Sequence, residues 1–131
     1  AAMGLANLPY MGEIAQYRKE LYAYYDEKLM NLDVQRININ LDATFNCAYY
    51  PIIFKSEGDL LKSIHELNIN RIYPRRYFYP SLSTLPYVND ITVTPIANDL
   101  ASRVICLPLY NGLSFEEVDF VCRILLRVQN N

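Results

Sequence analysis

The sequence has few of the residues from which small proteins build metal sites and nucleophilic centres. His65 is the only histidine, which excludes a multi-histidine metal site, and any His-paired nucleophile would have to use it. It falls on the polar edge of a predicted helix, so we expect it on the solvated surface. Cys47, Cys106 and Cys122 are far apart among apolar neighbours, and they predict buried, reduced thiols rather than a disulfide framework or a zinc site.

Other absences concern phosphate loops, membranes and nucleic acids. The four glycines are isolated from one another, which excludes a glycine-rich phosphate loop. No apolar run approaches the roughly eighteen residues of a membrane span, and no signal peptide precedes the first predicted helix. The net charge of −2 and the pI near 5.3 argue against a general nucleic-acid binder. We therefore expect a cytoplasmic protein that binds neither membranes nor nucleic acids.

The four lysines also lack the surroundings of catalytic lysines. Lys19, Lys28, Lys55 and Lys62 all lie in polar, surface-like contexts. A lysine that forms a Schiff base must be desolvated or lie beside another cation, and none of these four meets that condition in the sequence. We therefore predict no catalytic residue, no cofactor-binding residue and no metal ligand within this chain.

The abundant residues predict one α+β domain. The chain of 131 residues is long enough to bury a core, and 52% of it is apolar. Its periodicity predicts helices over 9–30, after Ser56, over 95–103 and after Ser114, and strands over 37–41, 47–54, 69–73 and 104–107. Residues 2–8 have the pattern of a preceding helix end. This order predicts a small α+β sandwich with helices on one face of a short sheet.

Several element boundaries carry recognisable local signals. Ser56 is placed to cap the second long helix, and Thr94 precedes a proline at the start of the short one. Ser114 and Glu117 have the spacing of a capping box for the last helix. Pro51 lies inside a predicted strand, where its missing N–H predicts an edge position or a bulge.

The segment RIYPRRYFYP, residues 71–80, concentrates the chemistry of the chain. It contains three arginines, three tyrosines and two prolines, and it leads into an irregular loop that reaches Asn89. Guanidinium groups suit phosphate or carboxylate, tyrosine rings offer stacking faces, and prolines stiffen the segment. The alternatives are tyrosines that pack with ion-paired arginines, or a single-strand nucleic-acid surface, for which one stretch on an acidic chain is thin support. The residues alone predict a loop that could hold an anionic, partly planar ligand.

Four segments in order resemble one known family. They are AAMGLANLPYM at 1–11, YYPIIF at 49–54, LLKSIHELNINRIYPRRYFYPSL at 60–82 and ASRVICLPLYNGLSFEEVDFVCRIL at 101–125. Together they resemble the C-terminal part of the DegT/DnrJ/StrS family of PLP-dependent nucleotide-sugar aminotransferases. The most specific pieces are LPLYNGLS and the Ala-Ala-Met-Gly-Leu opening.

The resemblance implies a fold and a reaction. Residues 1–30 would link two domains, 31–131 would form the small C-terminal α+β domain of a fold-type I aminotransferase, and the large PLP-binding domain would be absent. The family reaction is amino transfer, commonly from glutamate, to a keto-deoxysugar attached to a nucleoside diphosphate, in cell-surface polysaccharide or deoxyaminosugar biosynthesis. The resemblance also implies a homodimer with PLP bound in the full-length enzyme.

This sequence departs from the family's pattern in two respects. The family's Schiff-base lysine and its PLP partners lie upstream of this segment, which implies that the chain alone binds no PLP and is inactive. Many relatives carry His-Tyr-Pro in the loop, where this chain has Arg76 to Pro80, a form that resembles the subgroup acting on deoxythymidine-diphosphate sugars. We expect Arg75, Arg76, Tyr77 and Tyr79 to contact the nucleotide-sugar substrate, with Arg76 and Tyr77 as the strongest candidates.

A non-catalytic alternative stays open. The same α+β order is compatible with a stand-alone domain that senses a small ligand or binds another protein. Under the aminotransferase interpretation, the first helix and the loop would normally meet a large domain or a dimer mate. We therefore expect exposed apolar surface on both segments.

Overall fold

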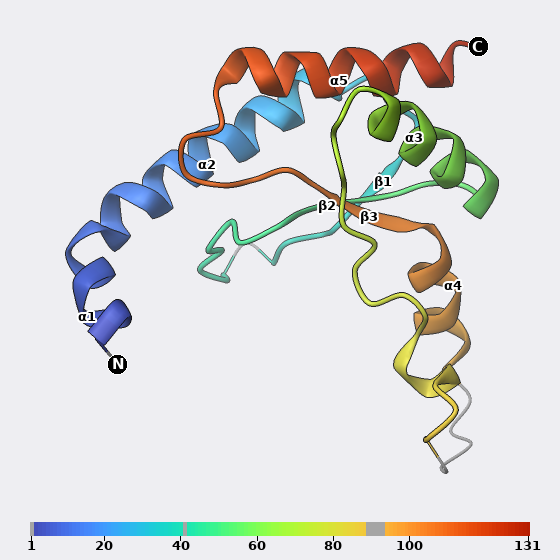
Figure 1. The fold of residues 1–131 in the computed structure, drawn as a ribbon, viewed down its shortest axis with the longest axis horizontal. Helices are drawn as coiled ribbons and strands as arrows, with labels where there is room; N and C mark the ends of the chain where they lie inside the picture. The colour runs from blue at the N-terminus through green and yellow to red at the C-terminus, as the bar shows by residue number, and fades with distance from the viewer. Residues whose placement is uncertain (1, 41, 89–93) are drawn as a thin grey trace.

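The computed structural model of the chain describes residues 2–40, 42–88 and 94–131 and has an α+β architecture (Figure 1). Its elements, in order, are α1 (Ala2–Asn7), the 3-10 turn η1 (Leu8–Tyr10), α2 (Met11–Lys28), β1 (Gln35–Arg36), β2 (Tyr50–Ile53), α3 (Glu57–Ile69), the 3-10 turn η2 (Leu82–Thr84), α4 (Pro95–Arg103), β3 (Val104–Leu107) and α5 (Phe115–Gln129). The three strands form one antiparallel sheet in the order β1-β2-β3. The predicted α+β class is confirmed.

Pro51 lies where the central strand has only one neighbour. It pairs with Cys106 of β3, whereas β1 extends only to the pair between Arg36 and Ile52. The N–H of Phe54 donates to the carbonyl of Arg103, the residue just before β3, so alternate residues of this strand direct their N–H groups toward β3. The nitrogen of Pro51 therefore faces away from β3, toward the side where β1 has already ended. This edge position is one of the two that its missing N–H predicted.

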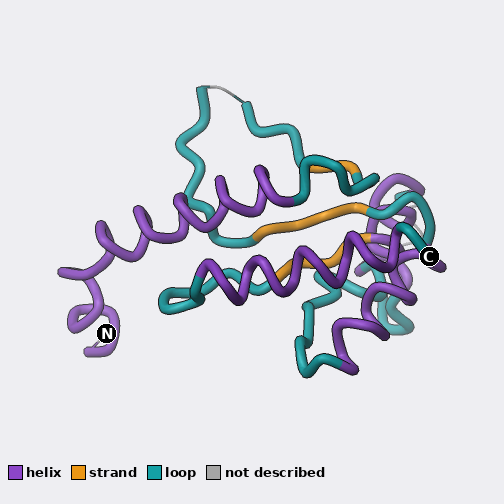
Figure 2. The backbone as a smooth tube through the Cα atoms, turned by 90° about the horizontal axis from the view of Figure 1, so that it is seen from above, coloured by secondary structure: helices purple, strands orange, loops and turns teal. Residues whose placement is uncertain are grey.

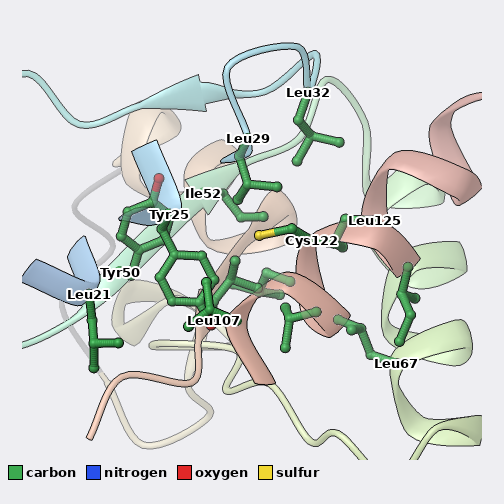
Figure 3. Close-up of a cluster of buried hydrophobic side chains, with 14 of the residues drawn as sticks. Leu21, Tyr25, Leu29, Leu32, Tyr50, Ile52, Leu67, Leu107, Cys122 and Leu125 are labelled. Carbon is green, nitrogen blue, oxygen red and sulfur yellow. The ribbon is translucent and has the colours of Figure 1, made fainter. Parts of the chain in front are cut away.

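Helices α2, α3 and α5 cover one face of the sheet, while α4 lies on the other side in Figure 1. The tube view shows α2 and α5 running alongside the strands (Figure 2). The core between these layers takes every second residue of the strands, including Tyr50, Ile52 and Ile105, together with the inner stripes of the helices. Figure 3 shows this cluster.

Two tyrosines connect the helical layer to the sheet. Tyr25 of α2 is fully buried, and its ring stacks on that of Tyr50 with a centroid separation of 4.6 Å. The Tyr25 hydroxyl donates a hydrogen bond to the carbonyl of Pro108 at 3.0 Å, and the Tyr50 hydroxyl donates to Asp26 at 2.8 Å. Both buried phenols therefore have the partners that their burial requires.

Two of the predicted helix caps are confirmed. The Ser114 Oγ accepts from the N–H of Glu117 at 3.2 Å, and the Glu117 carboxylate accepts from the N–H of Ser114 at 2.8 Å, which completes a capping box. The Ser56 Oγ likewise accepts from the N–H of Asp59 at 3.1 Å. The predicted Thr94 cap is wrong in its chemistry: its side chain makes no cap hydrogen bond, because its hydroxyl contacts Ser83 at 2.7 Å.

The strand predicted over 37–41 is wrong over its described residues. Leu41 lies outside the described residues, and the strand that does form, β1, ends just before Ile37. Ile37 is exposed, and the side chain of Asn40 accepts from the N–H of Asp42 at 3.1 Å, so a local turn replaces strand pairing. The strand predicted over 47–54 is shorter than expected, because Cys47 takes a left-handed φ of 49° that interrupts it.

The strand predicted over 69–73 is also wrong, because α3 continues to Ile69. Only Arg75 pairs with the sheet, through a single bridge to Cys106. The long first helix differs in detail as well, since Pro9 lies in η1 and α2 begins at Met11. Helix α3 thus extends further along the chain than predicted. The predicted strand does not form because its residues, apart from the nearby Arg75, find no partner in the sheet.

The N-terminal segment projects away from the sheet (Figures 1 and 2). Its apolar side chains are exposed: Met3, Leu5, Leu8, Tyr10 and Met11. The loop also exposes Tyr73 and Phe78, so the expected exposed apolar surface is present on both segments. None of the described helices is both long enough and apolar enough to cross a bilayer.

The core predicts a contrast between two leucines of α3. Leu67 is fully buried and Leu61 is half exposed. Leu67→Ala should lower the free energy of unfolding by about 2 to 5 kcal/mol because it leaves a cavity. Leu61→Ala, the matched control, should change it by less than about 0.5 kcal/mol. Urea unfolding followed by circular dichroism measures both, and equal losses would contradict the described helix orientation.

Candidate functional site

The loop that follows α3 is fixed to the sheet by the backbone of Arg75. The Arg75 N–H donates to the carbonyl of Cys106 at 3.1 Å, and the Cys106 N–H donates back at 2.9 Å. Arg75 lines a groove at this side of the sheet, whereas Arg76 is engaged elsewhere, with α3 and α4. This alternation of neighbouring side chains is expected for extended backbone. The structure thus separates the two arginines that the sequence places together.

The Arg76 guanidinium is held within the domain. Its Nη2 donates to a carboxylate oxygen of Glu57 at 2.9 Å and to the carbonyl of Ser102 at 2.7 Å. Its Cζ lies 3.4 Å from the centre of the Tyr79 ring. Arg76 therefore connects the loop to the first turn of α3 and the last turn of α4, and it orders Tyr79 by a cation–π contact.

Tyr77 rests against Tyr49, the residue before β2. Their rings lie 4.7 Å apart, and the Tyr77 hydroxyl donates to the Tyr49 hydroxyl at 3.0 Å. This hydrogen bond raises the pKa of Tyr77 above its ordinary value. Tyr77 also lines a shallow, largely apolar cleft of about 220 Å³ with Pro51 and Val104, on the sheet face opposite the main helices.

Arg75 opens instead into a larger groove of about 790 Å³. Much of its polar and aromatic lining comes from separate parts of the chain: Arg18 of α2, Arg71, Tyr73 and Arg75 after α3, Tyr110 after β3, and Glu117 of α5. The groove therefore combines three guanidinium groups with one carboxylate. Because three guanidinium groups face one carboxylate, the local charge is positive on a chain whose net charge is −2.

Arg71 occupies an unusual backbone position at this groove. Its φ of 61° is left-handed, which costs a non-glycine residue roughly 1 to 2 kcal/mol. The Arg71 N–H donates to the carbonyl of Asn68, and the Ile72 N–H donates to that of Leu67, both at 2.9 Å. These two bonds form a Schellman motif with Arg71 at the C′ position, where glycine is the usual residue.

The sequence-predicted site residues are therefore divided between two sides of the loop. Arg75 lies in the groove, Tyr77 and Tyr79 lie on other surfaces, and Arg76 is ion-paired. Whether they contact a ligand stays a prediction. Arg18 and Arg71 were missed as groove residues.

Only one of the two missed arginines had a recognisable signal in the sequence. Arg18 had none, because only the fold brings α2 beside the loop after α3. Arg71 would have been recognised as a C′ residue had α3 been extended to Ile69, because Leu67 and Ile72 supply the apolar pair of a Schellman motif.

The lysines do not have the surroundings of an imine-forming residue. Lys19, Lys55 and Lys62 are exposed, and Lys55 pairs with Asp33. Lys28 contacts Tyr24 and Asp119, and these contacts raise its pKa, whereas a nucleophilic lysine needs a lowered pKa. Within the described residues, no group of histidine, cysteine and carboxylate side chains could hold a metal ion.

The three thiols are buried, and burial raises the pKa of each. The pKa of Cys122 rises to about 12, so its thiolate fraction at pH 8 is about one in ten thousand. Because the thiolate is the reactive form, we predict slow labelling of the native chain by a disulfide reagent at pH 8, slowest at Cys122. All three cysteines should react quickly in guanidinium chloride. Rapid labelling of Cys122 in the folded chain would contradict the described core.

Comparison with known proteins places this geometry in a class: a small α+β domain that recurs within aminotransferase structures. An aminotransferase (TlmJ) from Streptoalloteichus hindustanus matches with a TM-score of 0.88 and 20% identity, over 97% of this chain and 35% of that one. A structure of DesI in the presence of its TDP-sugar product matches with a TM-score of 0.83 and 24% identity, over 97% of this chain and 34% of that one. At these identities the likeness shows the fold.

The chain belongs to the DegT/DnrJ/EryC1/StrS aminotransferase family, whose sequence profile matches residues 1–126. The dTDP-4-amino-4,6-dideoxy-D-glucose transaminase of Escherichia coli is 29% identical over 134 residues, covering 96% of this chain and 36% of that protein. The GDP-perosamine synthase of Vibrio cholerae is 28% identical over 130 residues, covering 93% and 34%. The chain thus spans about a third of the length of the curated relatives it matches.

The family uses PLP, and a Streptococcus pneumoniae protein with the same fold is known in a PLP form. The lysines of this chain do not fit that cofactor, since none is both buried and free of a carboxylate partner. The family match over residues 1–126 and the likeness to solved aminotransferase structures confirm the resemblance at the level of the family and the fold.

Proposed function

We propose that this chain forms the C-terminal small domain of a PLP-dependent aminotransferase that transfers an amino group, from glutamate, to a nucleotide-linked keto-deoxysugar. The observation that carries the proposal is the family match over residues 1–126, which covers nearly the whole chain but only a third of its relatives. Both curated relatives described above are named for nucleotide-linked amino sugars. The product would serve cell-surface polysaccharide or deoxyaminosugar synthesis.

In this proposal the catalytic lysine and the PLP site belong to a large domain outside the chain. Residues 1–30 form the linking region, and 31–131 form the α+β sandwich. Two features support this division: the lysines present have surface environments, and residues 2–11 expose apolar side chains that a neighbouring domain could cover. On its own, the chain would hold no PLP and would not transaminate.

The loop would supply one wall of the substrate site. We propose that Arg75, Tyr77 and Tyr79 contact the nucleotide sugar. For Arg76 we propose a positioning role, because its guanidinium already has Glu57 and Ser102 as partners. The groove beside Arg75 has the volume of a small-molecule site.

The complete enzyme is proposed to be a cytoplasmic homodimer. The exposed apolar residues of α1 and of the loop would lie at a domain or subunit boundary. Three buried thiols without a disulfide, all among the described residues, agree with a reducing compartment.

A stand-alone, non-catalytic domain is the second candidate, and one observation favours it. The chain has a core of its own, with side chains from α2, α3, α5 and the sheet buried together. Such a domain could sense a small anionic ligand in the groove without any large domain.

A cofactor test separates the two candidates. PLP added in equimolar amount to the 131-residue chain should give neither stoichiometric aldimine absorbance nor a borohydride-stable adduct at a single lysine, because exposed or ion-paired lysines form only weak, unselective aldimines. A longer protein that carries this chain together with an upstream lysine-bearing domain should give both signals. Stoichiometric trapping of PLP on Lys28 of the short chain would refute the proposed division. Failure of the longer protein to bind PLP would favour the stand-alone domain.

Kinetics of the complete enzyme test the positioning role of Arg76. Arg76→Ala should raise KM for the nucleotide sugar roughly tenfold, about 1.4 kcal/mol, with a small effect on kcat, because it releases the loop without touching the reacting atoms. Glu57→Gln should produce a smaller change in the same direction. Arg127→Ala, which removes an exposed ion pair with Glu66, is the control and should leave KM unchanged. A large fall in kcat with unchanged KM would rule out this role.

A further inference from the structure

We propose that Arg18, Arg71 and Arg75 together form a diphosphate-binding site in the groove. The proposal rests on the proposed function in identifying the ligand as the pyrophosphate of a nucleoside diphosphate. The site itself is argued from the groove alone. These three residues come from α2, from the turn after α3 and from the loop that pairs with β3, and they line one cavity.

The first argument is the pattern of ion pairing. Four other arginines have carboxylate partners: Arg36, Arg76, Arg103 and Arg127. Across residues 2–40, 42–88 and 94–131, no salt bridge involves any of the three groove arginines. Elsewhere the chain neutralises most of its guanidinium groups internally, but in the groove it leaves three of them together. Such an arrangement attracts anions.

The second argument concerns the acceptors available in the groove. Glu117 is its carboxylate, and one oxygen of Glu117 accepts the N–H of Ser114 at 2.8 Å. The Nε of Arg18, like that of Arg76 outside the groove, is buried and lacks a hydrogen-bond partner within the described part of the chain. A buried donor without an acceptor is uncommon in folded proteins. The groove therefore holds three guanidinium groups and a single carboxylate, which is already engaged as an acceptor.

The third argument is the backbone of Arg71. The C′ position of a Schellman motif favours glycine, yet this chain places a long cationic side chain there with a φ of 61°. Nothing in the packing of α3 requires that side chain, since Arg71 is exposed and the apolar closure of the motif is made by Leu67 and Ile72. Strained backbone conformations of this kind are concentrated at functional sites, and a role of the Arg71 guanidinium in the groove would explain why this position is not glycine.

Three guanidinium groups fit a diphosphate better than a carboxylate. One planar fork satisfies one carboxylate, whereas the oxygens of two linked phosphoryl groups can accept from several forks at once. Tyr73 and Tyr110 border the same groove and offer ring faces beside the anion. A nucleoside diphosphate would therefore meet both charge and stacking surface.

Calorimetric titration of the chain with inorganic pyrophosphate tests the site directly. We expect saturable one-to-one binding that weakens as salt is raised. Arg71→Gly is the sharpest variant, because glycine suits the left-handed position and should keep the fold and its melting temperature. It should lower pyrophosphate affinity at least tenfold, as should Arg75→Gln. Arg123→Gln, on the exposed side of α5, is the matched control and should bind like the parent.

The outcomes separate the two proposals. If the folded chain fails to bind pyrophosphate, or if Arg123→Gln weakens binding as much as Arg71→Gly, the diphosphate site is overturned. Thymidine diphosphate should bind more tightly than pyrophosphate, and equal affinity would show a site for free phosphate alone and overturn the nucleotide assignment. The chain could bind pyrophosphate through these arginines while the complete protein fails to transaminate sugar nucleotides. That pair of results would support the diphosphate site and refute the proposed function.

Discussion

The reciprocal hydrogen bonds between Arg75 and Cys106 determine the layout of the candidate site. They attach the loop after α3 to the sheet at a single residue pair, and in doing so they direct consecutive side chains to different surroundings. Arg75 lines the groove, while Arg76 is anchored by Glu57 and Ser102. Without this bridge, the loop would have no fixed register against β3, and neither the groove nor the Tyr77–Tyr49 contact would have a defined geometry.

The bridge can be this small because the layer behind it is well packed. The strands are short, and β1 has only two residues, so sheet hydrogen bonds alone would hold them weakly. The stack of Tyr25 on Tyr50 and the hydrogen bond from Tyr25 to Pro108 tie α2 to the sheet and to the segment after β3. The groove is therefore built on a rigid base, which lowers the entropy lost when a ligand binds.

Local signals predicted the helices better than the strands. Ser114 and Glu117 specified the start of α5 because a capping box depends on residues three apart. The strand expected at Ile37 does not form because a strand needs a pairing partner distant in sequence. The pairing of β1 with β2 ends at Arg36. At the site, composition identified the loop but could not tell that Arg76 would find Glu57 nineteen residues away. Arg18 was unpredictable for the same reason, since only the fold brings α2 beside the loop.

The projecting N-terminal arm has a consequence for how the chain assembles. Helix α1 has six residues, buries none of them and is continued by η1 and α2. A terminal helix this short is only marginally stable in water without tertiary packing, and a surface that covered Met3, Leu5 and Leu8 would stabilise it. Folding of the arm and docking of its partner become one thermodynamic event, so protection of its backbone amides from hydrogen exchange reports directly on assembly.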